Sequence, residues 1–247
     1  MLRNHYTHFM PIAQVISDIH FEHHRDDGQA FFLNGFDSEQ ADLLILAGDI
    51  VEYWGIQKYL SVFSNHYRDV LYVLGNHEYY GSSFDDVSEI VKSKHMPSNV
   101  RVLHRDHCMI EGQKFIGCTL WFPNDSETMK HKNRLNDFRY IKDYEHWVFE
   151  ENRQDIEYLQ QHTDEQSIVI THHLPTTKAI PQRFEGSPLT GFFVCDMQPY
   201  HVHPKIWVFG HTHWHVDITD EKGTRFLANP YGDIQNSGFQ KQCLFFF

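Results

Sequence analysis

The chain has 247 residues, of which 41% are hydrophobic, and it carries a formal net charge of −12 with neutral histidine. This length allows one large domain with a buried core. No segment approaches the about 20 consecutive apolar residues that a membrane-spanning helix needs. The acidic balance argues against tight binding to duplex nucleic acid, which requires a broad basic surface.

The cysteines and the N-terminus indicate the compartment. Cys108, Cys118, Cys195 and Cys243 are scattered without a C-x-x-C pair, which is typical of reduced thiols in a cytoplasmic protein. Residues 1–10 lack the basic-then-apolar layout of a signal peptide. We therefore expect a cytoplasmic protein without integral membrane association, whose oligomeric state the sequence does not predict.

Strands and helices alternate over the first hundred residues. Apolar runs at residues 12–16, 43–47 and 70–74 predict strands, and the second, apolar throughout, is predicted to be central and parallel. Helical spacing predicts helices at residues 53–67 and 84–94. This alternation favours right-handed β-α-β crossovers. The apolar residues of the first helix that we assign to the core are Trp54, Tyr59, Leu60 and Phe63.

The rest of the chain is richer in short strands. Helical spacing predicts one long polar helix at residues 144–162, with Trp147, Ile156 and Leu159 on its inner face. The predicted strands lie at residues 100–103, 108–110, 114–118, 167–171, 206–209, 216–219, 225–228 and 243–247. Two sheets with helices outside them fit this pattern better than one sheet. No repeat or Pro/Ser-rich linker divides the chain, so we expect a single domain over residues 1–247.

Two long connections remain, at residues 120–143 and 174–204, for which no regular structure is predicted. Loops of that length in a compact domain are usually functional, so we expect them to form the walls of a substrate cleft. They contain Arg134, Arg139 and Arg183. Each arginine is a candidate for contact with a substrate phosphate, although for each alone solvation or pairing with a neighbouring acid is the more common outcome.

Polar clusters follow the predicted strands, at the usual address of ligand sites in α/β folds. The clusters are Asp18-Ile19-His20, Gly48-Asp49, Gly75-Asn76-His77-Glu78, His172-His173 and Gly210-His211-Thr212-His213. Together they supply the carboxylate, imidazole and amide groups that a pair of divalent metals needs. Two such ions, about 3.5–4 Å apart, would neutralise phosphate oxygens, lower the pKa of a shared water and hold it in line with the leaving group.

The spacing within the clusters supports shared ligation. Asp18 and His20 are separated by one residue, so in extended geometry both side chains point the same way, and His211 and His213 share this spacing. Asp49 has two carboxylate oxygens and can bridge two metals.

The end of the third predicted strand, at residues 70–74, supplies two different groups. Asn76 offers a neutral amide oxygen as a ligand. The adjacent His77 would point elsewhere, toward substrate, as the candidate to protonate the leaving group. Taken singly, each cluster also fits a helix cap, a tight turn or a structural histidine. Their occurrence together at strand ends favours the metal site.

The ordered pattern D-x-H … G-D … G-N-H-[ED] … H … G-H-x-H, matched from Asp18 to His213, resembles the calcineurin-like metallophosphoesterase superfamily and its stand-alone bacterial-type phosphohydrolases. The resemblance implies an α/β fold in which two mixed β-sheets pack as a sandwich flanked by helices (αββα). It implies two divalent metal ions; the mixed ligands suit manganese, iron or zinc, with manganese favoured.

The resemblance also implies a role for each matched residue. It implies Asp18, His20 and His213 as ligands of the first metal, Asp49 as the bridge, and Asn76, His172 and His211 as ligands of the second. Within the pair His172-His173 it places the ligand first. His77 and Asp49 become the catalytic candidates, with His77 protonating the leaving group or steadying the phosphate.

Residues after Gly48-Asp49 bear on the subfamily. Protein Ser/Thr phosphatases continue with x-x-Asp-Arg-Gly, which this chain lacks. Glu52 and Trp54 are similar to the G-D-x-x-E-x-W of UDP-diacylglucosamine hydrolases, which usually carry Arg where this chain has His77. We expect hydrolysis of a small phosphodiester or phosphomonoester by in-line attack of a metal-bridging hydroxide. The alternatives are a UDP-diacylglucosamine-type pyrophosphohydrolase, a non-catalytic scaffold on the same fold, and a nuclease limited to short single-stranded ends.

Overall fold

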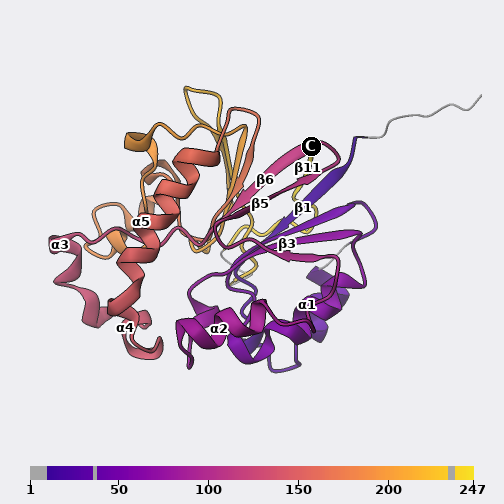
Figure 1. Ribbon diagram of the computed structural model, residues 1–247, viewed down its shortest axis with the longest axis horizontal. Helices are drawn as coiled ribbons and strands as arrows, with labels where there is room; N and C mark the ends of the chain where they lie inside the picture. Colours follow the sequence, from indigo (N-terminus) through magenta and orange to yellow (C-terminus); the bar gives the residue numbers. More distant parts are fainter. Residues whose placement is uncertain (1–9, 36–37, 233–236) are drawn as a thin grey trace, which may run out of the picture.

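The computed structural model describes residues 10–35, 38–232 and 237–247. Residues 1–9 are outside these ranges. The prediction that residues 1–10 form no signal peptide therefore concerns, apart from Met10, residues that the structure does not describe. Over the described residues the chain forms a five-stranded and a six-stranded mixed sheet with helices outside them (Figure 1). The predicted fold class is confirmed.

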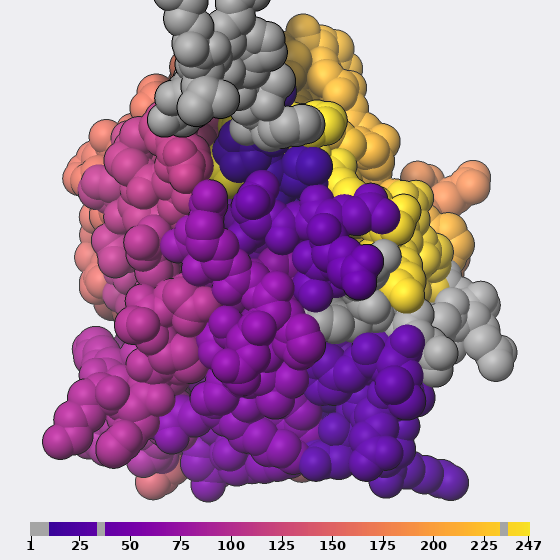
Figure 2. All heavy atoms as spheres, turned by 90° about the vertical axis from the view of Figure 1, so that its right-hand side faces the viewer, coloured from indigo at the N-terminus to yellow at the C-terminus, as the bar shows by residue number. Residues whose placement is uncertain are grey.

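The first sheet has the strand order β11-β1-β2-β3-β4. Its strands are β1 (Ile12–Ile16), β2 (Leu43–Ala47), β3 (Asp69–Val73), β4 (Val100–Val102) and β11 (Leu244–Phe246). Strands β1 to β4 are parallel, and β11 pairs with β1 antiparallel, so the C-terminal segment lies beside the first strand (Figure 2). As predicted from its unbroken apolar run, β2 is parallel and central.

The second sheet has the order β5-β6-β7-β8-β10-β9. Its strands are β5 (Asp106–Ile110), β6 (Gln113–Gly117), β7 (Ile168–Ile170), β8 (Ile206–Phe209), β9 (Val216–Thr219) and β10 (Arg225–Ala228). Strands β5 and β6 form a hairpin whose turn residues Glu111 and Gly112 both have positive φ, 48° and 84°. Such two-residue turns match the twist of the paired strands. The neighbours β6, β7, β8 and β10 are parallel, and β9 is antiparallel.

The sheets pack face to face through alternate residues of their strands. Ile45 of β2 and Val208 of β8 belong to one fully buried apolar cluster between the sheets. Leu44, the neighbour of Ile45, points to the opposite face and packs with the helices there, while Trp207 does the same on the second sheet. Since side chains alternate along a strand, both faces of each central strand are buried.

Helices form the outer layers. Helices α1 (Ile56–Ser64) and α2 (Phe84–Val91) cover the first sheet, and α5 (Tyr144–His162) covers the second (Figure 1). The bounds of α5 agree with the prediction, and Ile156 and Leu159 are buried as expected, while Trp147 is partly buried. Within the described ranges, no helix combines the length and apolar character needed to cross a bilayer.

The first predicted helix is shorter than expected. Residues Tyr53–Gly55 form a separate 3₁₀ turn, and α1 begins only after it. Assigning Trp54 to the core is therefore wrong: it is 54% exposed, and its indole donates a hydrogen bond to Glu52 at 3.1 Å. A 3₁₀ turn advances 120° per residue, which rotates Trp54 off the apolar stripe of the helix. The other assigned core residues Tyr59, Leu60 and Phe63 are buried.

The two long connections are not structureless. The first contains α3 (Ser126–Met129) and α4 (Asp137–Tyr140). Such single turns are too short to leave a periodic pattern in the sequence. The first connection also contains the 3₁₀ helix Lys132–Arg134. The second connection contains four 3₁₀ helices, at Thr177–Ala179, Gln182–Phe184, Thr190–Phe192 and Gln198–Tyr200. Outside the two connections, 3₁₀ helices lie at Phe21–His23, Tyr53–Gly55 and His77–Tyr79, and a π-helical turn lies at Phe31–Gly35.

Candidate metal centre

The polar clusters meet where the carboxyl ends of the parallel strands of both sheets come together. Asp18, Asp49 and Asn76 follow β1, β2 and β3 of the first sheet, and His172 and His211 follow β7 and β8 of the second. Backbone hydrogen bonds join the loops: Asp18 N donates to Gly48 O at 3.0 Å, and Gly210 N donates to His172 O at 3.0 Å. The sandwich thus carries distant segments to one edge.

One group consists of Asp18, His20, Asp49 and His213, whose ligand atoms all lie within 4.8 Å of one another. The Nε2 atoms of His20 and His213 are 3.1 Å apart. His213 Nε2 lies 3.4 Å from Asp18 Oδ1, and His20 Nε2 lies 3.7 Å from Asp49 Oδ2. Two imidazole nitrogens and two carboxylates therefore point into one small volume.

A second group consists of Asp49, His172 and His211. His172 Nε2 lies 3.4 Å from Asp49 Oδ2 and 3.1 Å from His211 Nδ1. The amide oxygen of Asn76 lies 3.1 Å from the same His172 nitrogen. Because Asp49 belongs to both groups, the two candidate positions share one carboxylate.

The donor set fits a pair of divalent cations. Asp18 and Asp49 are 0% and 1% exposed, and in the described part of the chain only histidines pair with them. Burying carboxylates without a cation is costly. Oxygen and imidazole nitrogen donors suit manganese, iron or zinc. The structure brings all the residues predicted as ligands together, and their role as ligands stays a prediction.

The charges in this cluster perturb one another. Burial disfavours the charged form of His172, but the carboxylate of Asp49 outweighs it and raises the pKa of His172 to about 9. In turn, burial raises the pKa of Asp49, while the positive charges of His172 and His77 more than compensate and hold that pKa well below its usual value. Such mutual stabilisation of opposite charges marks a strongly polar site inside an apolar shell.

Two glycines allow the backbone to come this close. A Cβ on Gly75 would lie 2.3 Å from Asp49 Oδ1, and one on Gly210 would lie 2.6 Å from the carbonyl oxygen of Ala47 and 2.9 Å from Asp18 Oδ2. All three distances are too short for a side chain at either position. The glycines of the two motifs are therefore required by the close approach of loops around the carboxylates.

His173, the neighbour of His172, lies outside both groups. Its ring is fully buried against Trp121 and His211, with centroid distances of 5.1 and 4.3 Å. Neither ring nitrogen has a hydrogen-bond partner among the described residues. Burial lowers the pKa of His173 well below its ordinary value, so the ring is neutral and packs behind His211.

His77 stands beside the candidate ligands. Its backbone N–H donates to Asp49 Oδ1 at 2.9 Å, and its Nδ1 lies 2.8 Å from Glu22 Oε1. The ring stacks on Tyr80 at a centroid distance of 4.2 Å. Burial opposes its charge, but the carboxylates of Asp49 and Glu22 outweigh that effect and raise the pKa of His77 to about 9. A protonated imidazole next to the metal positions is a suitable proton donor.

Glu22 is a residue that the sequence reasoning missed. Its Oε1 lies 3.1 Å from His20 Nδ1 as well as 2.8 Å from His77 Nδ1. A carboxylate on the second nitrogen of a metal-ligating histidine fixes its tautomer and orientation. Extended alternation does not identify it, because Asp18 and His20 adopt left-handed backbone conformations (φ 50° and 54°) and Glu22 lies in the 3₁₀ helix Phe21–His23.

Glu78 was part of the recognised motif but received no role. It is fully buried and accepts hydrogen bonds from Asp49 N (3.0 Å), Ile50 N (2.8 Å) and Gly75 N (2.8 Å), and from the Tyr72 hydroxyl (2.6 Å). One carboxylate thus ties together the loops after β2 and β3. Its acidic identity at the end of G-N-H-[ED] was the available signal.

A cavity of about 420 Å³ opens onto the metal positions and is lined by Asp49, His77 and His211. Its outer walls are residues 134–137 and parts of 183–193, from the two long connections expected to form a cleft. We call this cavity the metal cleft. Arg134 and Arg183 line it, whereas Arg139 is not among its lining residues.

The two arginines of the metal cleft are available for anions. No carboxylate pairs with either of them in the described ranges, and both are exposed. The Arg183 guanidinium lies over the rings of Phe184 and Trp214, at 4.8 and 5.2 Å from their centroids. Stacking of this kind positions the guanidinium while leaving its N–H groups free for phosphate oxygens.

Structural comparison finds the same fold in a solved hydrolase and a solved phosphatase. The phosphopantetheinyl hydrolase of Mycobacterium tuberculosis superposes with a TM-score of 0.70 at 14% identity, covering 90% of this chain and 90% of that one. A dimetal phosphatase from Danio rerio gives a TM-score of 0.51 at 12% identity, over 89% of this chain and 87% of that one. At these identities the likeness shows the fold.

Sequence comparison identifies the family. An uncharacterized protein of Acanthamoeba polyphaga mimivirus is 27% identical over 244 residues, covering 83% of this chain and 85% of its own length. The calcineurin-like phosphoesterase family profile matches residues 10–215, which include every candidate ligand. The chain therefore belongs to the calcineurin-like phosphoesterase family and is a metal-dependent phosphoric ester hydrolase.

Proposed function

We propose that this protein hydrolyses a small phosphodiester or phosphomonoester at a dinuclear metal centre. The observation that carries the proposal is the position of Asp49, whose carboxylate is common to two groups of ligand atoms. The proposed ligands are Asp18, His20 and His213 for one ion, Asp49 for both, and Asn76, His172 and His211 for the other. When bound, the ions would offset the charge of the phosphate and lower the pKa of a shared water.

The protein's own groups supply the remaining steps. Arg134 and Arg183, unpaired at the rim of the metal cleft, would hold phosphate oxygens and orient the ester. His77, held by Glu22, would donate a proton to the departing oxygen. Asp49 would orient His77 through the backbone N–H of that residue. Water and a phosphodiester give an alcohol and a phosphomonoester, whereas water and a phosphomonoester give an alcohol and inorganic phosphate.

The alternatives fit less well. Glu52 and Trp54, which are similar to the motif of UDP-diacylglucosamine hydrolases, do not line the metal cleft, and Trp54 points to solvent. A scaffold without catalysis has no need for a full ligand set with an adjacent His77. We also propose manganese as the metal, a cytoplasmic location and a single domain over residues 1–247, on the grounds given by the sequence.

A chromogenic diester tests the proposal. The purified protein, freed of metal and reloaded with manganese, iron or zinc, is expected to hydrolyse bis(p-nitrophenyl) phosphate, and the manganese form is expected to be fastest. Asp49→Asn should abolish turnover, while Asp85→Asn, an exposed aspartate on α2, should leave it unchanged. Absence of turnover of diesters and monoesters with every divalent ion would overturn the proposal.

A further inference from the structure

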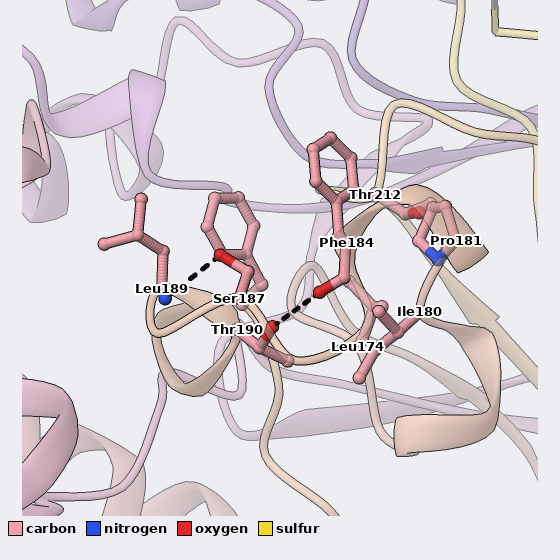
Figure 3. A pocket seen from close by; sticks show the side chains of 9 residues that line it. Leu174, Ile180, Pro181, Phe184, Ser187, Leu189, Thr190 and Thr212 are labelled. Atoms are coloured by element: carbon pink, nitrogen blue, oxygen red, sulfur yellow. Dashed lines mark hydrogen bonds between the residues drawn. The ribbon is translucent and has the colours of Figure 1, made fainter.

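A second cavity, of about 160 Å³, adjoins the metal cleft (Figure 3). It lies among the short helices of the second long connection, and its walls include Leu174, Ile180 and Pro181. Four residues line both cavities: Phe184, Leu189, Phe193 and Thr212. The two spaces are therefore separated by no more than one layer of side chains, and we call the second one the apolar subsite.

The apolar subsite is close to the chemistry. Phe193 stacks on the imidazole of His211 with a centroid distance of 4.6 Å and an interplanar angle of 29°. Thr212 sits between the candidate ligands His211 and His213 in the chain. A group bound in the apolar subsite would thus lie close enough to be part of the same molecule as a phosphate held at the metal positions.

The hydroxyl groups at the wall are almost all occupied. Ser187 Oγ accepts a hydrogen bond from Leu189 N at 3.3 Å, and Thr190 Oγ1 donates to Phe184 O at 3.2 Å (Figure 3). Both bonds hold the short helices in place. A nucleobase or sugar placed here would lose its hydrogen bonds to water without replacement, which is costly.

Thr212 is the exception. Thr212 is only 6% exposed, and its hydroxyl has no hydrogen-bond partner among the residues that the structure describes. A buried hydroxyl without a partner is a cost that a ligand oxygen can remove. Thr212 lies at the junction of the two cavities, where the oxygen that joins phosphorus to an apolar group would lie.

The size of the apolar subsite indicates what it holds. An apolar cavity of about 150 Å³ is known to remain dry and to accept benzene, and the apolar subsite is of that size. We propose that it binds a phenyl-sized apolar group of the substrate, and that the Thr212 hydroxyl donates a hydrogen bond to an oxygen on the substrate phosphorus. The inference rests on the proposed function and specifies its substrate class: a phosphoester of an aryl or short branched alkyl alcohol.

Binding of two phosphonates tests the inference without relying on turnover. Dissociation constants of phenylphosphonate and methylphosphonate are measured by calorimetry on the manganese-loaded protein. Burial of one ring should make phenylphosphonate bind roughly tenfold to a hundredfold more tightly. Equal affinities for the two ligands would overturn the proposal that the apolar subsite binds a phenyl-sized group of the substrate.

Variants test whether the preference for phenylphosphonate over methylphosphonate arises in the apolar subsite. Leu189→Trp, which fills the subsite, and Phe184→Ala, which opens its wall, should each reduce the preference for phenylphosphonate at least severalfold. Met109→Ala removes an apolar side chain that is 57% exposed on β5, and should leave the preference unchanged. A preference that both subsite variants retain in full would contradict the assignment.

Thr212 is tested separately. Thr212→Val, which keeps the shape but removes the hydroxyl, should weaken both phosphonates severalfold, and Thr212→Ser should restore binding. If Thr212→Val binds both ligands as the parent does, the role of the hydroxyl is wrong. Failure of the subsite is distinguishable from failure of the proposed function, because hydrolysis of bis(p-nitrophenyl) phosphate would then persist while the phenyl preference is absent.

Discussion

Asp137 Oδ1 accepts a hydrogen bond from Asn76 Nδ2 at 2.8 Å, and the oxygen of the same amide lies 3.1 Å from His172 Nε2. Asp137 also accepts from the Tyr80 hydroxyl at 2.7 Å and is 3% exposed. It belongs to α4, within the long connection that walls the metal cleft. A residue of the cleft wall therefore orients a proposed ligand that follows β3.

Removing the hydrogen bond between Asp137 and Asn76 should weaken binding of the metal ion for which Asn76 is a proposed ligand. In Asp137→Ala the Asn76 amide loses its shorter hydrogen bond and keeps only the one to the Tyr80 hydroxyl at 3.4 Å, so we expect metal affinity and kcat/KM to fall about 10- to 100-fold. Metal titration followed by diesterase assay measures both. Asp143→Ala, an exposed aspartate before α5, is the control. Unchanged metal affinity in Asp137→Ala would show that Asn76 needs no orienting partner.

Glu22 should matter most when the leaving group is poor. Glu22→Gln keeps the shape but removes the negative charge beside His77 and His20, so we expect kcat for an alkyl ester to fall more than kcat for a p-nitrophenyl ester, which needs no proton. The ratio of the two rates is the measurement. Glu165→Gln, an exposed glutamate, should keep the parental ratio. An equal loss for both esters would contradict a role in proton donation.

Metal binding should stabilise the fold. Asp18 and Asp49 are buried together, so cations that compensate them bind the native state alone and stabilise it by about 3 kcal/mol at a hundredfold excess over Kd. Thermal unfolding with manganese and with a chelator gives the difference. The shift should be absent in Asp49→Asn. A shift of equal size in that variant would place the stabilising metal elsewhere.

The second sheet carries a separate pH-dependent contact. Arg105 donates to Glu151 at 2.7 Å and to Asp155 at 2.9 Å, and Asp155 Oδ2 accepts from Leu120 N at 2.8 Å. Burial raises the pKa of Asp155 to about 6, although Arg105 opposes it. A raised folded-state pKa means that the contribution to stability is complete below the usual value of 3.8 and is lost as pH rises through 6.

We therefore expect the unfolding free energy to fall by about 2 kcal/mol between pH 4 and pH 6 from this group. Urea unfolding in the presence of a chelator, compared with Asp155→Asn, isolates the effect. The variant should show a flatter profile over the same range. Parallel profiles for parent and variant would mean that Asp155 titrates with its ordinary pKa.

The sequence predicts those parts of the structure that short-range patterns encode. The apolar run of β2 predicted a central parallel strand, and the strand-end position of Asp49 placed it beside residues more than a hundred positions away. Both follow because parallel strands deliver their carboxyl ends to one edge. The family pattern then supplied the roles that spacing alone left open.

Other parts depend on tertiary context. Trp54 falls on the helical stripe by spacing, but a 3₁₀ turn rotates it to solvent. Asp137 reaches Asn76 only because α4 folds back over the strand ends, and no local pattern marks a one-turn helix. The apolar subsite likewise arises from one-turn helices between residues 177 and 192, whose packing no periodicity reveals.

Manganese stoichiometry with electron paramagnetic resonance addresses the shared carboxylate most directly. The account predicts about two manganese ions per chain, with the spectrum of an exchange-coupled pair, and at most one uncoupled ion in Asp49→Asn. A single ion in the parent protein, or two ions without coupling, would contradict it.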